Sequence, residues 1–347
     1  MPLSNSDAKR RRSAVWDFLA GGRPLSLIEV PGEDLRERMR REVLAGLADP
    51  LRPSIPPAYL YDARGSELYE RITALPEYYP TRTEARLLAQ VAPLLAERFS
   101  IRQLVELGSG SSAKTRMLLD AFEAGRRGLT YVPIDISREI LGHTANQLVE
   151  AYPGMRVLAI AAPFDEAIAL LPPCEQRLVL FLGGTLGNFP QKQQEVFFRG
   201  LHAAMTPGNH LLLGFDRRAH AGKPVSILHA AYNDAQGVTA RFNENLLIRL
   251  NRELGADFVA ARWRHRATYE LPAHQITMVL ESLGDQEVRV AGRRFRFRSG
   301  EGILTEVSRK FDPEELASWL SERGFSPQAC WMDAAETYGL MVLRREG

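Results

Sequence analysis

The sequence predicts an α/β protein in which a doubly wound parallel sheet is joined to a second, smaller α+β domain. The chain of 347 residues is long enough for about two domains. Short apolar runs alternate with helical stretches between residues 103 and 215, which is typical of parallel strands covered by helices on both faces. The alternation stops after Asp216 and returns after Lys310, as expected when a second domain is inserted into the first.

Composition and charge exclude several classes of protein. Apolar residues make up 45% and charged residues 25% of the chain, a globular balance. Forty-four Lys and Arg against 42 Asp and Glu give a net charge of +2, which offers no case for nucleic-acid binding. Cys174 and Cys330 lie far apart and are expected to be buried, reduced thiols. No apolar run approaches the roughly 18 residues of a membrane helix and no signal peptide is recognisable, so a cytoplasmic protein is expected.

The first hundred residues predict helices and turns. The basic run Lys9–Arg12 is expected to lie in a solvated, frayed tail. Apolar spacing predicts an amphipathic helix over Leu35–Leu47, and Pro53 then begins a break. Two further helices are expected over Glu67–Leu75 and Thr83–Phe99, the second with a strong apolar side.

Five buried strands follow, separated by helices. Each is a short run dominated by Val, Leu, Ile and Ala, the pattern of a strand buried on both faces. The expected strands are Gln103–Leu107, Thr130–Ile134, Met155–Ile160, Arg177–Leu182 and His210–Phe215.

The rest of the chain predicts an insertion and then a return to the first domain. A long helical pattern runs through Asn233–Leu254, and hairpin-like runs follow near residues 264–270, 275–283 and 289–298. Beyond the insertion, a helix over Pro313–Arg323 and strands over Gln328–Asp333 and Tyr338–Arg344 are expected. The domain division is therefore residues 20–81 for the N-terminal helical part of a substrate domain, 82–216 for a Rossmann-like cofactor domain, 217–309 for the inserted substrate domain, and 310–347 for the completion of the cofactor domain.

A glycine turn after the first of the five strands indicates a cofactor that contains adenosine. Gly108 and Gly110 permit a tight turn and a close approach of the backbone to a ligand. Lys114 lies in the first turn of the next helix, whose partly positive N-terminus suits a carboxylate. Asp135 ends the second strand, where an acid accepts hydrogen bonds from both ribose hydroxyls. These residues predict a ligand site at the carboxyl edge of the sheet.

Two cofactors fit this turn. Gly108, Gly110 and Ala113 satisfy the dinucleotide pattern GxGxxG/A, which leaves a nicotinamide coenzyme open. S-adenosylmethionine is favoured by Glu106 directly before the turn, by the long stretch that precedes it, and by the helix and two strands after the fifth strand, as in the class I methyltransferase sheet. The seven histidines show no spacing typical of a metal site.

Longer motifs resemble those of the histidine-specific, S-adenosylmethionine-dependent methyltransferases. The stretch ELGSGSSAKTRMLLD at 106–120 resembles their first motif. Five further stretches match in the same order: YDARGSELY at 61–69, EYYPTR at 77–82, FLGGTLGNF at 181–189, YNDAQGVTARFN at 232–243 and ILTEVSRKF at 303–311. The resemblance runs from about residue 25 to the C-terminus.

The resemblance, together with the glycine turn, implies roles for individual residues. The implied cofactor contacts are Gly108, Gly110, Lys114, Asp135 and Phe164, the last beside the adenine. The family often has Asp before this Phe, whereas this chain has Pro163, so the adenine amine is left to a backbone carbonyl. The implied contacts to a histidine substrate are Tyr78, Asn188, Tyr232, Glu306 and Ser308, with Tyr61 near its α-amine as the catalytic residue.

The chemistry explains these residue types. Asn188 and Tyr232 can donate to an α-carboxylate, and Tyr61 can accept from the amine. Glu306 would accept from an imidazole N–H while Ser308 serves the other nitrogen, and both point the same way if they alternate along a strand. A charge-assisted bond of this kind contributes roughly 1.5–3 kcal/mol, enough to select histidine over an apolar side chain.

The resemblance implies trimethylation of the α-amine of L-histidine to hercynine, in ergothioneine biosynthesis, by a monomer that needs no nucleic acid or membrane. Three alternatives stand beside it. Relatives act on other amino-acid amines, including tryptophan derivatives, although the Glu306 and Ser308 pair favours histidine because an indole needs only one acceptor. A nicotinamide-dependent oxidoreductase rests on GxGxxA alone, and a silent ligand-binding protein would bind the cofactor without turnover.

Overall fold

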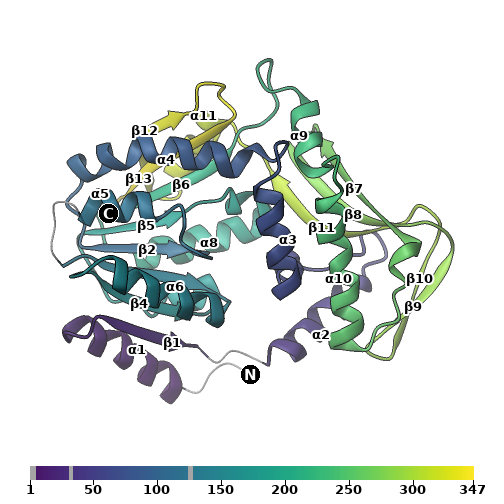
Figure 1. Ribbon diagram of the computed structural model, residues 1–347, viewed down its shortest axis with the longest axis horizontal. Coiled ribbons are helices and arrows are strands. Elements are labelled where there is room, and N and C mark those ends of the chain that lie inside the picture. The colour runs from purple at the N-terminus through teal and green to yellow at the C-terminus, as the bar shows by residue number, and fades with distance from the viewer. Residues whose placement is uncertain (1–4, 31–33, 124–127) are drawn as a thin grey trace.

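The computed structural model describes residues 5–30, 34–123 and 128–347, and its centre is an eight-stranded sheet (Figure 1). The strands follow the order β1-β4-β3-β2-β5-β6-β13-β12, and all are parallel except β13, which is antiparallel to both of its neighbours. This is the order of a class I methyltransferase sheet with one extra edge strand, so the predicted fold class is confirmed. The strands are β1 (Leu25–Glu29), β2 (Gln103–Leu107), β3 (Thr130–Asp135), β4 (Arg156–Ala161), β5 (Arg177–Phe181), β6 (His210–Asp216), β12 (Phe325–Met332) and β13 (Tyr338–Arg345).

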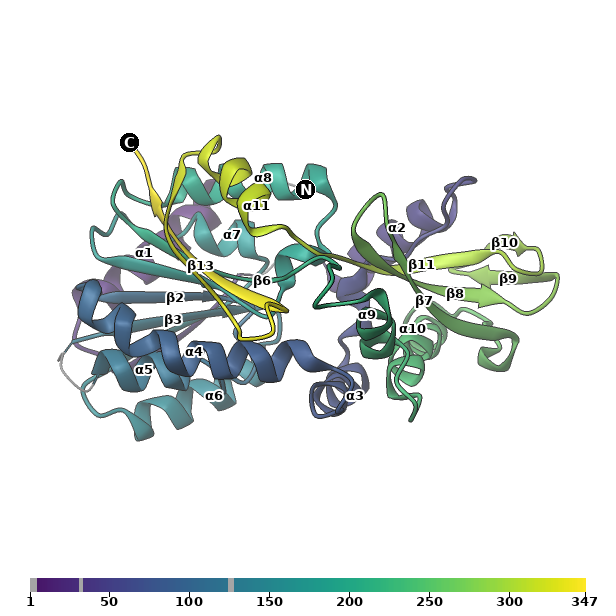
Figure 2. The same ribbon diagram turned by 90° about the horizontal axis from the view of Figure 1, so that it is seen from above.

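Helices cover both faces of this sheet (Figure 2). Because successive side chains of a strand point to opposite faces, alternate residues of the central strands enter two separate apolar clusters. One cluster packs against α4 (Tyr79–Arg98), α5 (Arg116–Glu123) and α6 (Arg138–Ala151). The other packs against α1 (Asn5–Ala20), α7 (Phe164–Ile168), α8 (Gln191–Ala204) and α11 (Pro313–Ser321).

A second domain lies beyond the carboxyl ends of the parallel strands (Figure 2). It has its own apolar core and combines segments from before and after the central strands. Its helices are α2 (Leu35–Leu47), η1 (Pro57–Leu60), α3 (Ala63–Thr73), α9 (Val225–Tyr232), α10 (Val238–Leu254) and η3 (Ala260–Arg262). A three-stranded antiparallel sheet joins β7 (Trp263–Glu270), β8 (Gln275–Ser282) and β11 (Gly302–Arg309), and a hairpin joins β9 (Gln286–Val290) to β10 (Arg293–Phe297).

The structure differs from the expectations at four places. Residues after Asn5 form α1 instead of a frayed tail, although the side chains of 5–12 lie outside the described residues. Strand β1 pairs with β4, so residues 25–29 belong to the main sheet and not to a helical part of the substrate domain. The helix expected over Asn233–Leu254 begins only at Val238, because Asp234 holds the preceding turn by accepting from Val238 N and Thr239 N, and α9 lies before the expected range. Both cysteines are free, but Cys330 is exposed on β12.

Candidate active site

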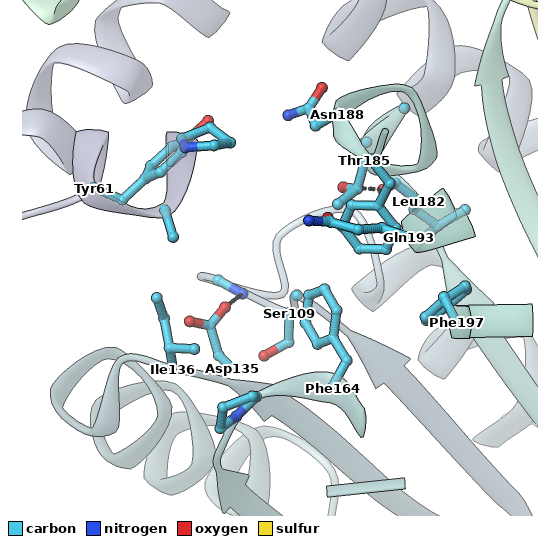
Figure 3. Close-up of a pocket in the computed structure, with 18 of the residues that line it drawn as sticks. Tyr61, Ser109, Asp135, Ile136, Phe164, Leu182, Thr185, Asn188, Gln193 and Phe197 are labelled. Carbon is cyan, nitrogen blue, oxygen red and sulfur yellow. Dashed lines mark hydrogen bonds between the residues drawn. The ribbon is translucent and has the colours of Figure 1, made fainter. Parts of the chain in front are cut away.

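The carboxyl ends of the parallel strands open into a pocket that both domains line (Figure 3). Ligands of open α/β sheets bind at this edge, because the loops there follow the strand ends. The pocket brings together the eleven residues that the sequence singled out: Tyr61, Tyr78, Gly108, Gly110, Lys114, Asp135, Phe164, Asn188, Tyr232, Glu306 and Ser308.

The glycine turn after β2 is held by the end of β3. Gly108 and Gly110 have φ of 75° and 48°, a left-handed region that glycine enters at little cost. Gly108 N donates to Ile134 O at 2.8 Å, and Gly110 N donates to Asp135 Oδ2 at 3.0 Å. The other oxygen of Asp135 accepts from Ser137 N at 3.0 Å. Asp135 therefore braces the turn and still has lone pairs for a ligand, since a carboxylate accepts about four hydrogen bonds.

Glu106 supports the glycine turn through buried hydrogen bonds. It is buried and accepts from Thr115 Oγ1 at 2.5 Å and from the Tyr131 hydroxyl, which also contacts Ser112 Oγ at 2.8 Å. Burial raises the pKa of Glu106 to about 7, and the two donated hydrogen bonds limit the rise. Glu106 thus connects β2, on which it lies, to Tyr131 of β3 and to Thr115 at the start of α5.

The cradle around the turn fits an adenosine group. A Cβ on Gly108 would lie 3.4 Å from the Phe164 ring, so the ring packs against the turn, and the φ of 75° is what favours glycine there. Ser109 Oγ is buried and has no hydrogen-bond partner among the described residues. Figure 3 shows Ser109, Asp135 and Phe164 around the same hollow, with Ile136 beside them. A free hydroxyl, a carboxylate and an aromatic ring are the groups that a ribose and a purine require.

Lys114 is paired with a residue that the sequence reasoning missed. Its ammonium forms an ion pair with Glu84 of α4, whose side chain is fully buried. Glu84 also accepts from Gly183 N at 2.7 Å and from the Tyr338 hydroxyl at 2.7 Å. Burial opposes the charge of Lys114, but the carboxylate beside it raises the pKa above its ordinary value, so the lysine stays cationic. The available signal was an acid three residues before Leu87, on the apolar side of the helix.

Aromatic rings form the wall of the pocket on the side of the second domain. Tyr61 meets Tyr69 and Phe242 edge to face, with ring centroids 5.5 and 5.4 Å apart. Tyr78 meets Tyr232 in the same manner at 6.0 Å. Burial raises the pKa of Tyr61 well above its ordinary value, and the nearby Glu306 adds to the rise. Tyr61 therefore presents a protonated phenol.

Strand β11 presents Glu306 and Ser308 to the pocket, as their alternation predicts. Both side chains are buried, and a register shift between Leu304 and Glu306 re-aims this part of the strand. Burial raises the pKa of Glu306 to about 7, while Lys310 and a hydrogen bond from Asn188 lower it. Asn188 ends η2 (Thr185–Asn188), the turn after β5, and so it reaches the carboxylate from the other domain.

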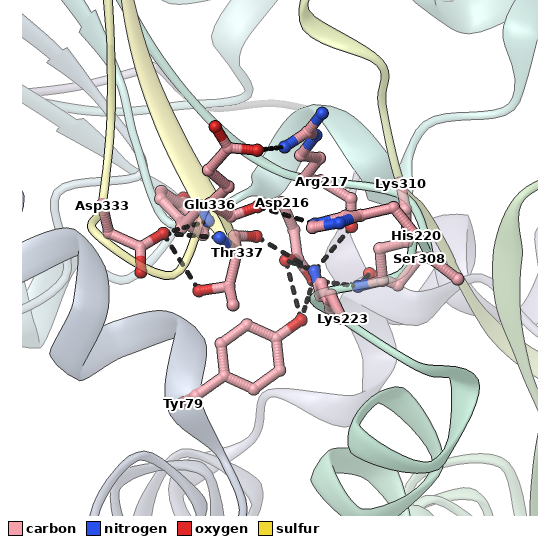
Figure 4. Close-up of polar contacts among 12 residues, drawn as sticks. Tyr79, Asp216, Arg217, His220, Lys223, Ser308, Lys310, Asp333, Glu336 and Thr337 are labelled. Atoms are coloured by element: carbon pink, nitrogen blue, oxygen red, sulfur yellow. Dashed lines mark hydrogen bonds and ion pairs between the residues drawn. The ribbon is translucent and has the colours of Figure 1, made fainter.

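A buried ion cluster lies behind this strand and was not foreseen (Figure 4). Asp216 at the end of β6 pairs with Lys223 at 2.5 Å and with Lys310 at 2.8 Å, and it accepts from the Tyr79 hydroxyl at 2.8 Å. Asp216 is buried, but the two ammonium groups lower its pKa below the ordinary value. Burial lowers the pKa of Lys223 to about 8, with Asp216 opposing and Lys310 adding to the effect.

Tyr232 and Ser308 are joined to this cluster. The Tyr232 hydroxyl donates to Ser308 Oγ at 2.9 Å, and Lys310 Nζ donates to both oxygens at 2.9 Å. From the sequence, the Tyr232 hydroxyl was expected to donate to the α-carboxylate of the substrate. In the structure it donates to Ser308 instead. Asn188 keeps an amide that faces the pocket.

The described part of the chain has no helix that is both long and apolar enough to cross a membrane. Over the same ranges, no group of three or more His, Cys, Asp and Glu side chains is arranged to hold a metal ion.

Comparison with known proteins agrees with the site. Residues 39–345 match the sequence profile of a family described as histidine-specific methyltransferase, SAM-dependent. The chain is 40% identical over 311 residues to histidine N-alpha-methyltransferase of Mycolicibacterium smegmatis, covering 89% of this chain and 95% of that protein. Identity to the enzyme of the same name from Mycobacterium tuberculosis is 40%, over 90% of this chain and 96% of that one. An L-tryptophan methyltransferase of Psilocybe serbica is 27% identical, over 88% and 92%. The chain therefore belongs to the histidine-specific, S-adenosylmethionine-dependent methyltransferase family.

Proposed function

We propose that the protein transfers methyl groups from S-adenosylmethionine to the α-amine of L-histidine and forms hercynine, the trimethylated betaine used in ergothioneine biosynthesis. The observation that carries the proposal is the buried pair of Glu306 and Ser308, which faces the pocket in a chain 40% identical to histidine N-alpha-methyltransferases. An acceptor and a hydroxyl side by side suit the two nitrogens of an imidazole.

The residues of the glycine turn are proposed to hold the cofactor. Asp135 would accept from the ribose hydroxyls, Phe164 would lie against the adenine, and Lys114 would pair with the methionine carboxylate at the start of α5. Gly108 and Gly110 have no side chains and adopt positive φ, so the cofactor can come close to the backbone of the turn. When bound, S-adenosylmethionine supplies a methyl group that its sulfonium makes electrophilic. The protein then contributes mainly alignment and exclusion of water.

Tyr61 is proposed to orient the acceptor amine. An α-amine is largely protonated near neutral pH, with a reference pKa of about 8. The phenol of Tyr61 stays protonated because burial raises its pKa, so it cannot remove a proton as an anion. It can instead accept an N–H of the amine through its oxygen and direct the nitrogen lone pair. By accepting an N–H it would position the amine for the first two of three successive transfers, because the neutral dimethylated amine has no N–H left to donate.

Glu306, Asn188 and Tyr78 are proposed to select and seat the amino acid. Glu306 would accept the imidazole N–H, and Asn188 would contact the α-carboxylate from the other domain, with Tyr78 beside the same end. An indole has one N–H and no lone-pair nitrogen, so a tryptophan would leave the Ser308 side of the pair unmatched. This mismatch makes the tryptophan derivative the second choice of acceptor.

The proposal takes the protein to be a monomer that acts on a free amino acid. We assign residues 82–216 and 310–347, together with β1, to the cofactor domain. The substrate domain then consists of residues 34–81 and 217–309.

A single incubation tests the proposed function. Purified protein is mixed with S-adenosylmethionine and the twenty amino acids, and the products are identified by mass. Gain of three methyl groups on histidine alone supports donor, acceptor and multiplicity together. Methylation of a different amino acid would overturn the reading of Glu306 and Ser308 while keeping the donor. Binding of the cofactor without any product would favour a silent member of the family.

A further inference from the structure

Lys310 uses all of its hydrogen-bond donors inside the protein. Its Nζ lies 2.8 Å from Oδ2 of Asp216, a residue beside it in Figure 4. It also lies 2.9 Å from both the Tyr232 hydroxyl oxygen and Ser308 Oγ. An ammonium group has three N–H donors and no acceptor. Each of these three oxygens must therefore accept from Lys310, which fixes the direction of all three hydrogen bonds. The side chain is 1% exposed, so water does not compete for these donors.

Ser308 is left with one free hydrogen-bonding function. Its Oγ accepts from Lys310 and also from the Tyr232 hydroxyl, which is 2.9 Å away. A serine hydroxyl has two acceptor lone pairs and one donor proton. Both lone pairs are occupied, so only the O–H can be directed into the pocket that Ser308 lines. Toward a ligand, Ser308 is a donor and not an acceptor.

Glu306 offers the opposite function on the same face of β11. Its carboxylate lines the pocket two residues before Ser308, and it accepts but does not donate when ionised. The pocket therefore presents one acceptor and one donor at neighbouring positions. A ring that matches both must carry an N–H and, at a second nitrogen, a free lone pair.

We propose that Lys310 is a positioning residue which makes Ser308 an obligate donor, so that the pocket selects an uncharged azole ring. Glu306 accepts the ring N–H, and Ser308 donates to the nitrogen that bears the lone pair. This inference rests on the proposed function and deepens it, from histidine in general to histidine with a neutral imidazole. An imidazolium carries N–H on both nitrogens, so one of them would oppose the Ser308 proton, and its charge would face that of Lys310.

The surrounding charges determine how this selection responds to pH. Asp216 stays ionised because two lysines face it, and Lys310 stays cationic because Asp216 raises its pKa despite burial. The donor arrangement thus persists from acid to neutral pH. The titratable or charged groups that face the cluster are Asp216 on β6, Lys223 before α9, Tyr79 on α4, Tyr232 on α9, Asp333 after β12, Tyr338 on β13, and Tyr61, Tyr78 and Glu306 on the pocket side.

A pair of matched ligands isolates the charge of the ring. The dissociation constant of L-histidine is compared with that of 3-(1,2,4-triazol-3-yl)-L-alanine by calorimetry at several pH values. The triazole keeps the N–H and the lone-pair nitrogen in the same places but is not protonated between about pH 5.5 and 8. Protonation of the α-amine, Glu306 and Lys223 affects the binding of both ligands alike. The ratio of the two dissociation constants therefore depends only on protonation of the ring. In the wild type we expect the dissociation constant of histidine, divided by that of the triazole, to rise about fivefold between pH 6.5, the reference pKa of imidazole, and pH 5.5.

Three substitutions and one double variant test whether Lys310 causes the selection. Lys310→Met frees a lone pair of Ser308, which can then accept from an imidazolium, so the rise should fall to less than about threefold per pH unit. Lys310→Arg keeps the positive charge and the hydrogen-bond donors, so it should show the same rise of the ratio with falling pH as the wild type. Ser308→Ala should also flatten the ratio, and adding Lys310→Met to it should change the ratio no further. Affinity for S-adenosylhomocysteine shows whether Lys310→Met is folded. If it is not, the ratio measured with Ser308→Ala tests the inference instead.

The outcomes are separable. The inference is overturned if the ratio of dissociation constants does not change with pH in the wild type. It is also overturned if Lys310→Met binds both ligands equally more weakly while the ratio changes with pH as in the wild type. Failure of the wild type to bind histidine at any pH overturns the proposed function, and the inference falls with it.

Discussion

At the scale of single residues, Glu306 combines a requirement of recognition with a cost to stability. In the unfolded chain a glutamate titrates near 4.5, whereas burial raises the pKa of Glu306 to about 7 in the folded protein. The folded state therefore binds this proton more tightly than the unfolded state. As the pH rises from about 4.5 to about 7, the group makes unfolding easier, and the loss remains at higher pH. A bound imidazole N–H would offset this cost, since it pairs with the carboxylate.

Glu306→Gln is expected to weaken histidine binding and to stabilise the protein without ligand. Loss of a charge-assisted hydrogen bond predicts a fall in histidine affinity of about 10- to 100-fold, with affinity for S-adenosylhomocysteine nearly unchanged. The free energy of unfolding should exceed that of the wild type at pH 8 and approach it at pH 5. Calorimetry and urea unfolding measure both effects. Glu301→Gln, at an exposed acid just before β11, is the matched control. Equal loss of both ligands would mean that Glu306 only supports the fold.

At the scale of helices and strands, the sequence predicted the elements whose signal is local. Strands β2 to β6 have bounds close to the predicted ones because each is a continuous apolar run buried on both faces. Strand β1 was missed because it is a partly exposed edge strand whose partner, β4, is distant in the sequence. The Lys310 and Asp216 pair was missed for a related reason, since only the fold brings the two residues together. Sequence motifs placed the pocket, but not the ionic support behind it.

The turn between α9 and α10 contains a glycine, Gly237, whose backbone conformation can be tested by substitution. Gly237 precedes α10 directly and has φ of 65°, so a side chain there is strained even though a Cβ would have room. Gly237→Ala should therefore lower the free energy of unfolding by about 1 kcal/mol. Gly200, an exposed glycine inside α8 with no neighbour near its Cβ position, is the control. Gly200→Ala should raise stability by about 0.5–1 kcal/mol, because alanine favours helix. Chemical unfolding compares the two, and a loss of similar size in both would contradict the argument.

At the scale of the whole molecule, Glu84 connects parts of the cofactor domain that are distant in sequence. It joins α4 to Lys114 after the glycine turn, to Gly183 after β5 and to Tyr338 on β13. Because its side chain is fully buried, its charge depends on these partners and not on water. A ligand carboxylate beside Lys114 would therefore bind next to a charge that the fold already balances.

Glu84→Gln is expected to lower stability and to increase the stabilisation that the cofactor product gives. Without the carboxylate, Lys114 keeps a poorly compensated charge, which costs about 2–3 kcal/mol, less than for a fully buried pair because Lys114 is 27% exposed. The carboxylate of S-adenosylhomocysteine would then replace part of the lost interaction. Urea unfolding with and without this ligand measures both quantities. Glu97→Gln, at an exposed acid of the same helix, should change neither. An unchanged ligand effect in Glu84→Gln would place the carboxylate away from Lys114.

Thermal unfolding distinguishes the methyl-donor site from a nicotinamide site in the intact protein. A ligand that binds only the folded state at 100 times its dissociation constant adds about 2.7 kcal/mol of stability. For a chain of 347 residues this corresponds to a rise in Tm of about 4 °C, since the entropy of unfolding scales with length. We expect S-adenosylhomocysteine to produce this rise and NAD to produce none. Asp135→Ala should abolish the rise at the same ligand concentration, while Asp120→Ala, at an exposed acid of α5, should retain it. A rise with NAD that depends on Asp135 would instead assign the turn to a dinucleotide, because the same glycines and the same acid serve either ligand.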